Sequence, residues 1–154
     1  YDVMIDKMMN FVQEAGAESV PLDKLLAESD FVTVHVPLLP QTKYLFDAPT
    51  IAKMKKGSLI INAARGGIIE EKALVNALKS GHLAGAALDV YEEEPVVGGH
   101  HPLLEMPNVV CTPHLGYVEK TVYESYYGTA IDGILAFAAG TPVNVLNPEA
   151  LGKR

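Results

Sequence analysis

The segment SLIINAARGGIIEEKALVNALKSGHLAGAALDV, residues 58–90, decides the fold. Residues 58–64 are a nearly continuous apolar run, residues 70–80 are amphipathic with helical spacing, and residues 84–90 form a second apolar run. A strand, a helix and another strand in this order predict two parallel strands joined by a crossover helix. Because both runs are apolar on both faces, we expect a sheet that helices cover on both sides.

The same alternation continues on both sides of this segment. We expect further helices over residues 5–15, 21–29 and 49–56, further strands over residues 31–36 and 108–112, and a long helix over residues 117–139. Glycines follow several of these helices, where they suit a helix end. The predicted fold class is therefore α/β with a doubly wound parallel sheet.

The long helix predicted over residues 117–139 has apolar side chains on more than one face. Lys120, Glu124 and Asp132 interrupt it and exclude a membrane span. A helix that is apolar on all sides is usually buried between two bodies. We therefore expect it to pack on another domain, on a second subunit, or on both.

The composition excludes several classes of protein. The 154 residues carry a formal net charge of −7, which argues against a protein that binds the phosphate backbone of nucleic acids. No apolar run reaches about 18 residues, so no membrane-spanning segment is expected, and the N-terminus does not resemble a signal peptide. We expect a soluble cytoplasmic protein with neither a nucleic-acid nor a membrane partner.

The cysteine and histidine content predicts no metal centre. Cys111 is the single cysteine, which excludes an internal disulfide, and its apolar neighbours indicate a buried core thiol. No cysteine and histidine cluster has metal-ligand spacing. His100 and His101 follow two glycines and are interpreted as a solvated turn.

Each predicted strand ends in a short polar signature: HVP (35–37), NAARGG (62–67), LDVYEEEP (88–95) and TPHLG (112–116). The carboxyl ends of parallel strands meet at one edge of the sheet, where ligands bind. Arg65, Asp89, Glu94 and His114 should therefore converge there. Singly, each could be a surface, capping or core residue. Together, a cation, carboxylates and an imidazole predict an acid–base site for an anionic substrate.

At these residues the sequence resembles the D-isomer-specific 2-hydroxyacid dehydrogenases. The resembling segments are HVPLLPQT (35–42), MKKGSLIINAARGGIIEEKALVNALKSGHLAGAALDVYEEEP (54–95) and NVVCTPHLG (108–116). The resemblance implies a Rossmann-like NAD-binding domain over residues 1–116, incomplete at its N-terminus. It also implies that residues 117–154, a long helix and a tail, pack on a missing substrate domain or a partner subunit.

The resemblance also implies which residues form the site. Arg65, Glu94 and His114 would be catalytic, Glu94 being chosen because the family's acid directly precedes a proline. Asp89 would hold the nicotinamide carboxamide, and Asp2 would bind the adenosine ribose hydroxyls, which favours NAD over NADP. The remaining cofactor contacts would come from Val36, Pro37, Thr42, Ala63, Ala64 and Gly116. The implied partners are a small anionic 2-hydroxy or 2-oxo acid and a second copy in a homodimer.

Two features depart from the family pattern. No G-x-G-x-x-G fingerprint is present, and neither is a substrate domain, so we expect a fragment of a protein roughly twice as long that is inactive alone. Tyr117 stands where many relatives have a small residue, so glyoxylate, hydroxypyruvate and 3-phosphoglycerate all remain open as substrates. The alternative function is an NAD-sensing module like the carboxyl-terminal-binding corepressors. A hydrolase is disfavoured because no G-x-S-x-G motif occurs.

Overall fold

The computed structural model describes residue 1 and residues 9–151. The chain divides into two compact units, Tyr1–Leu115 and Gly116–Arg154, which are described separately below. Asp2 and the first four residues of the helix expected over residues 5–15 lie outside the described residues.

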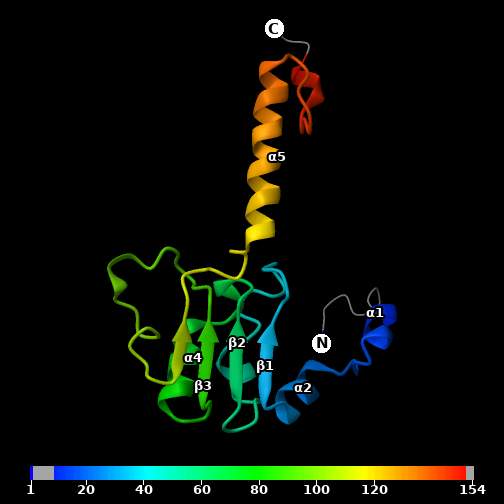
Figure 1. Cartoon of the computed structure of the whole chain (residues 1–154). Helices are drawn as coiled ribbons and strands as arrows, with labels where there is room; N and C mark the ends of the chain where they lie inside the picture. The colour runs from blue at the N-terminus through cyan, green and yellow to red at the C-terminus, as the bar shows by residue number, and fades with distance from the viewer. Residues whose placement is uncertain (2–8, 152–154) are drawn as a thin grey trace. The chain divides into compact units, whose positions relative to one another are not determined.

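The first unit is built on a sheet of four parallel strands in the order β1 (Phe31–Val34), β2 (Leu59–Asn62), β3 (Gly85–Leu88) and β4 (Val109–Cys111), shown in Figure 1. The predicted parallel arrangement is confirmed. The strands are in register at their last residues, since Val34 lies opposite Asn62, Asn62 opposite Leu88, and Leu88 opposite Cys111. The polar segments that follow the four strands therefore begin at one common edge.

One face of the sheet carries the hydrophobic core. Val32, Ile60 and Ala86 are neighbours in register and are all buried. They belong to one apolar cluster with side chains of the helices α2 (Leu22–Glu28), α3 (Ala48–Ile51) and α4 (Glu71–Lys79). In Figure 1, α4 lies behind the sheet. Its buried residues, Ala73, Leu74 and Leu78, recur at the spacing of an amphipathic helix, as the sequence predicts.

The opposite face differs from the expectation of a sheet covered on both sides. Ile61 and Ala87 are only half-buried, and Phe31 and Val110 remain 67% and 66% exposed. Within residues 9–115, helices cover one face only. The apolar side chains of the other face are typical of a sheet that packs against a second layer.

The helices agree with the sequence except at α3. α1 (Met9–Glu14), α2 and α4 lie within the predicted ranges, but α3 ends at Ile51 instead of continuing to residue 56. Two backbone N–H groups beyond the helix make tertiary hydrogen bonds: that of Lys55 donates to the carbonyl of Leu26, and that of Gly57 donates to the carbonyl of His82. These tertiary hydrogen bonds replace the helical ones and lead the chain into β2.

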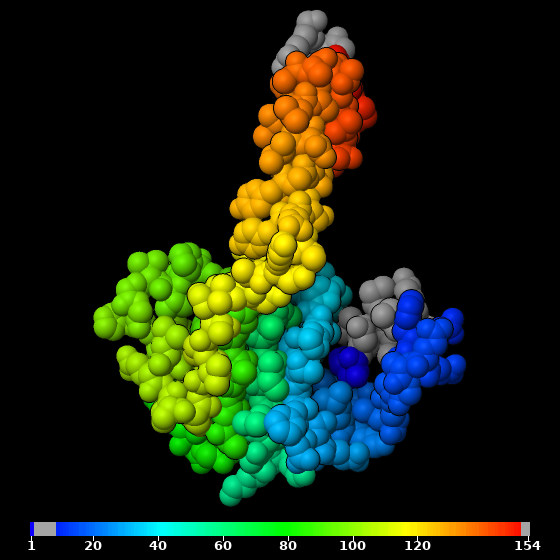
Figure 2. Space-filling view, viewed as in Figure 1, coloured from blue at the N-terminus to red at the C-terminus, as the bar shows by residue number. Residues whose placement is uncertain are grey.

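The second unit contains α5 (Lys120–Ala138) and a 3₁₀ turn (Pro148–Ala150). None of the residues of α5 is buried within the described chain, and its exposed side chains appear yellow to orange in Figure 2. Tyr123 stacks on Tyr117 with ring centroids 6.5 Å apart and contacts Tyr127 at 5.5 Å. Among the helices that the structure describes, none has the length and apolarity required to span a bilayer.

Candidate active site

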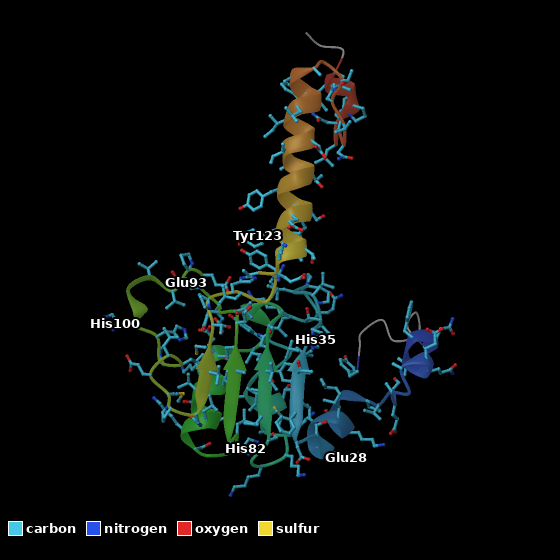
Figure 3. The ribbon with its side chains drawn as sticks, viewed as in Figure 1. Glu28, His35, His82, Glu93, His100 and Tyr123 are labelled. Atoms are coloured by element: carbon cyan, nitrogen blue, oxygen red, sulfur yellow. The ribbon has the colours of Figure 1, made fainter. Side chains whose placement is uncertain are left out.

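The candidate site lies at the carboxyl edge of the parallel sheet. In Figure 3, His35 marks this edge just after β1, whereas His82 and Glu28 mark the opposite edge. Arg65 follows β2 by three residues, Asp89 directly follows β3, and His114 follows β4 by three residues. The predicted convergence of these strand ends on one edge is therefore observed.

Glu94 and His114 form an ion pair across this edge. The Oε2 atom of Glu94 lies 2.8 Å from Nδ1 of His114, and each side chain is about one third exposed. The other carboxylate oxygen, Oε1, accepts the backbone N–H of Tyr91 at 2.8 Å. Because an ionised carboxylate only accepts hydrogen bonds, Nδ1 carries the proton in this contact.

Asp89 supports the turn that carries His114. Its carboxylate is buried, and Oδ1 accepts both the Thr112 hydroxyl and, at 2.7 Å, the backbone N–H of Leu115. These two residues flank His114, whose backbone adopts a left-handed conformation with φ of 57°. For a residue with a side chain, that conformation costs about 1–2 kcal/mol. The turn therefore needs contacts of this kind to hold it.

Tyr91 joins the segments that carry Glu94 and His114. Besides the backbone contact with Glu94, its hydroxyl donates to the carbonyl oxygen of Thr112 at 3.1 Å. Burial, and to a smaller extent a hydrogen bond with Cys111, raises the pKa of the Tyr91 hydroxyl. The hydroxyl therefore stays protonated, as a donor, throughout the neutral range.

Arg65 lies in a tightly packed turn after β2. Buried Asn62 shapes this turn by donating to the carbonyl of Arg65 at 2.9 Å and accepting the N–H of Ala64 at 3.0 Å. A Cβ atom at Gly66 would lie 1.8 Å from the carbonyl oxygen of Tyr91, so only glycine allows this approach. The Arg65 turn thus packs against the Tyr91 backbone. The guanidinium is exposed, and its Nη1 donates to the carbonyl of Ala64 at 2.6 Å.

The residues expected to contact the cofactor differ in accessibility. Pro37 and Ala63 are exposed, and Val36 and Ala64 are half-buried. Thr42 is fully buried, and its hydroxyl donates to the carbonyl of Pro37 at 2.6 Å while it accepts the N–H of Leu39 at 2.8 Å. Thr42 therefore stabilises the loop after β1. Gly116 begins the second unit, and Asp2 lies outside the described residues.

This edge fits a dinucleotide on chemical grounds. Small and apolar residues, Val36, Pro37, Ala63 and Ala64, follow β1 and β2 with part of their surface accessible. Such residues allow a flat ring to approach the backbone, and a carboxylate, that of Asp89, follows the neighbouring strand. Among the described residues, no group of histidine, cysteine and acidic side chains is arranged to hold a metal ion.

A pocket of about 480 Å³ opens beside the Glu94–His114 pair. Both residues line it, together with mainly apolar side chains that include Val96, Leu104 and Pro113. Its volume is within the usual range for small-molecule sites. Cys111 also lines this pocket and is half-buried, so it is less enclosed than the core thiol that the sequence indicated.

The loop after Glu94 is tied to α4 by contacts that the sequence did not indicate. Just before Glu94, Glu92 accepts the backbone N–H of Glu71 at 2.8 Å, and Glu71 accepts that of Glu92 at 2.7 Å. Nε2 of His101 lies 3.0 Å from a Glu71 oxygen, and Nδ1 accepts the N–H of Leu103. The expectation of a solvated turn is therefore wrong for His101, whose side chain is only 17% exposed, because its partner Glu71 lies 30 residues earlier. His100 is exposed, as expected.

Comparison with known sequences places this site in a family context. Residues 1–116 match the family described as D-isomer specific 2-hydroxyacid dehydrogenase, NAD binding domain. A D-3-phosphoglycerate dehydrogenase of Bacillus subtilis is 44% identical over 142 residues, which are 92% of this chain and 27% of that protein. A glyoxylate reductase of Korarchaeum cryptofilum is 39% identical over 146 residues, 94% of this chain and 44% of that protein.

A solved structure shows the same fold. The crystal structure of a putative D-3-phosphoglycerate dehydrogenase from Ralstonia solanacearum superposes with a TM-score of 0.83 at 38% identity. The similarity covers 94% of this chain and 43% of that one. The chain thus spans between about a quarter and less than half of the length of these relatives.

Proposed function

Because this chain belongs to the D-isomer-specific 2-hydroxyacid dehydrogenase family and matches its NAD-binding domain, we propose that it forms the catalytic, cofactor-binding part of an NAD-dependent oxidoreductase. The reaction is the reversible transfer of a hydride between nicotinamide and C2 of a small 2-oxo or D-2-hydroxy acid. Bound NADH supplies the hydride. The residues of this chain bind and orient the substrate and move the accompanying proton.

The Glu94–His114 contact carries this proposal. During reduction, Nε2 of protonated His114 donates a proton to the ketone oxygen of the substrate, and in oxidation it removes the hydroxyl proton. Glu94, 2.8 Å from Nδ1, fixes the orientation of the ring and directs its other nitrogen, Nε2, to the substrate. A histidine oriented by a carboxylate at a strand-end edge is suited to this acid–base role.

Arg65 is proposed to bind the substrate carboxylate. Its exposed guanidinium offers a planar set of donors that can make two parallel hydrogen bonds to a carboxylate. The same group can stabilise negative charge that develops on the carbonyl oxygen during reduction. The exposed side chain can reorient for this, because its guanidinium donates only to the adjacent Ala64 carbonyl among the described residues.

The cofactor is proposed to lie along the ends of β1, β2 and β3. Asp89 would accept the nicotinamide carboxamide, and Asp2 would bind the adenosine ribose hydroxyls. Val36, Pro37, Thr42, Ala63, Ala64 and Gly116 would form the rest of the binding surface, with Thr42 acting through the loop it stabilises.

The whole protein is proposed to be roughly twice as long as this chain. This chain covers 44% of the glyoxylate reductase and 43% of the solved structure. A further domain would cover the carboxyl edge of the sheet, and α5 would pack on such a domain or on a second subunit. We propose a soluble cytoplasmic homodimer that acts on a small anionic 2-oxo acid. The relatives are named as dehydrogenases and reductases, which does not favour an NAD-sensing corepressor.

The decisive experiment follows NADH consumption by the full-length protein with a panel of small 2-oxo acids. We expect turnover with at least one member, and His114→Ala should lower kcat by about 100-fold or more, the scale of a lost general acid. The same variant should still bind NADH, measured by fluorescence titration. If His114→Ala keeps the turnover of the wild type, His114 is not the general acid.

A further inference from the structure

We propose that Asp89, Thr112 and Tyr91 form a clamp that positions His114 against Glu94. The Asp89 carboxylate and the two hydroxyl groups position His114 without contacting the substrate. The inference rests on the proposed acid–base role of His114. It assigns to Thr112 and Tyr91 a function as positioning residues, and to Asp89 a second function besides contact with the cofactor.

The first part of the clamp is the carboxylate of Asp89. A single oxygen atom, Oδ1, accepts one hydrogen bond from the Thr112 hydroxyl, before His114, and one from the Leu115 N–H, after it. Asp89 itself is fixed, since it directly follows β3 and its backbone N–H donates to Asn62 at 2.9 Å. Both ends of the four-residue turn over residues 112–115 are therefore hydrogen-bonded to one buried carboxylate directly after β3.

The second part is Tyr91, two residues beyond Asp89. Its backbone N–H holds Oε1 of Glu94, and its hydroxyl holds the carbonyl of Thr112. Tyr91 is 92% buried, with only 8% of its surface exposed, so the ring has little freedom to move. It thereby fixes the distance between the segment that carries the carboxylate and the segment that carries the imidazole.

The backbone of His114 shows why such a clamp is required. With φ of 57°, this residue occupies a region of backbone conformation that residues other than glycine rarely adopt. Without these contacts, the backbone of this turn would relax to an ordinary conformation and move the His114 ring away from Glu94. The hydrogen bonds at Thr112 and Leu115 oppose that relaxation, so their effect on the reaction passes through the Glu94–His114 contact.

The test compares Thr112→Val with Thr112→Ser in the full-length enzyme. Valine has the same shape but no hydroxyl, and we expect kcat for reduction of the 2-oxo acid to fall about tenfold to a hundredfold, the effect of one hydrogen bond to a charged group. KM for NADH should not change. The dependence of kcat on pH should also change, because the contact between Glu94 and His114 is altered. Thr112→Ser should restore both properties.

A double-mutant cycle separates positioning from general loss of structure. If Thr112 acts through the contact between Glu94 and His114, adding Thr112→Val to Glu94→Gln should cause little further loss. Independent, additive losses would overturn the proposal, as would an unchanged kcat and pH profile in a folded Thr112→Val variant. Thermal unfolding shows which variants are folded. If Thr112→Val does not fold, Tyr91→Phe replaces it in the same cycle and should give the same non-additive result.

A readout without turnover distinguishes this proposal from the proposed function. Hydrogen exchange of the peptide that contains residues 112–116 should be faster in Thr112→Val than in the wild type, because the turn has lost one of its attachments. Should the wild-type enzyme reduce no 2-oxo acid, the proposed function fails while this comparison still tests the clamp. Equal exchange rates in the two proteins would refute the clamp itself.

Discussion

The side chains at the carboxyl edge of the sheet differ in how firmly the fold holds them. Arg65 is exposed and its guanidinium donates to the carbonyl of its neighbour Ala64, whereas His114 is held on one ring nitrogen by Glu94. A loosely held guanidinium can reorient toward a carboxylate, while a histidine that transfers protons benefits from a fixed orientation. The two residues are therefore expected to respond differently to conservative substitution.

Arg65→Lys tests the proposed contact with the substrate carboxylate. Lysine keeps the charge but cannot form two parallel hydrogen bonds, so KM for the 2-oxo acid should rise about tenfold or more, the loss expected for one charge-assisted hydrogen bond. KM for NADH, measured in the same assay, should stay constant. A lower kcat at unchanged KM would instead indicate that Arg65 stabilises charge only in the transition state.

Glu94→Gln tests whether the carboxylate orients the imidazole. Glutamine has nearly the same shape without the charge, so kcat for reduction should fall about tenfold or more, the scale of one charge-assisted hydrogen bond, while KM for NADH stays constant. Glu93→Gln is a matched control, because Glu93 is the exposed neighbour in the same run of glutamates. The control should keep the wild-type kcat, and equal losses in both variants would contradict the assignment to Glu94.

The sequence predicted where the candidate site residues lie but not the residues that support them. Parallel strands bring their ends to one edge, so the placement of Arg65, Asp89 and His114 followed from topology. The choice of Glu94 within three glutamates came from the family resemblance alone. The roles of Tyr91 and Thr112 could not be foreseen, because their hydrogen bonds join residues that are 21 and 23 positions apart.

At the scale of elements, the type of each segment was predictable and its ends were less so. Periodicity identified all four strands and the helix α4, because a core face and a solvent face differ strongly in polarity. The strand ends differ by one or two residues, since the last residues of each apolar run leave the ladder to form the site. α3 was predicted too long because the tertiary hydrogen bonds of Lys55 and Gly57 have no local signature.

The start of α3 provides a test of local stability. The Asp47 side chain accepts the N–H of Thr50 at 2.9 Å, and hydrogen bonding to Thr50 lowers the pKa of this carboxyl below its ordinary value of 3.8. We expect Asp47→Ala to lower Tm by about 2–4 °C at neutral pH, as for a lost helix cap in a protein of this size.

The pH dependence of this cap has a definite sign. A lowered pKa in the folded state means that the charge of Asp47 contributes stability above about pH 4, and that this part is lost as pH falls through the folded-state value. The difference in Tm between the wild type and Asp47→Ala should therefore shrink in acid. Asp47→Asn keeps the cap without a charge and should show no such change. A difference that is constant from pH 7 to pH 3 would contradict the charge effect.

At the scale of the whole molecule, the open face of the sheet and the exposed α5 are consistent with the proposal that this chain is part of a longer protein. An isolated chain of these 154 residues should bind NAD weakly and show no measurable turnover of 2-oxo acids. Measuring both on the isolated chain, with the full-length enzyme as a positive control, checks this expectation. Turnover comparable to that of the full-length enzyme would show that the site is complete within this chain.

The uncovered sheet has a practical consequence for handling the isolated chain. Within the described sheet, β1 is hydrogen-bonded only to β2, and its first residue, Phe31, is exposed. An unpaired strand edge bordered by apolar side chains is a template to which other extended chains can add. Isolated molecules would therefore tend to self-associate through this edge, so poor solubility on expression would not by itself show that the α/β unit fails to fold.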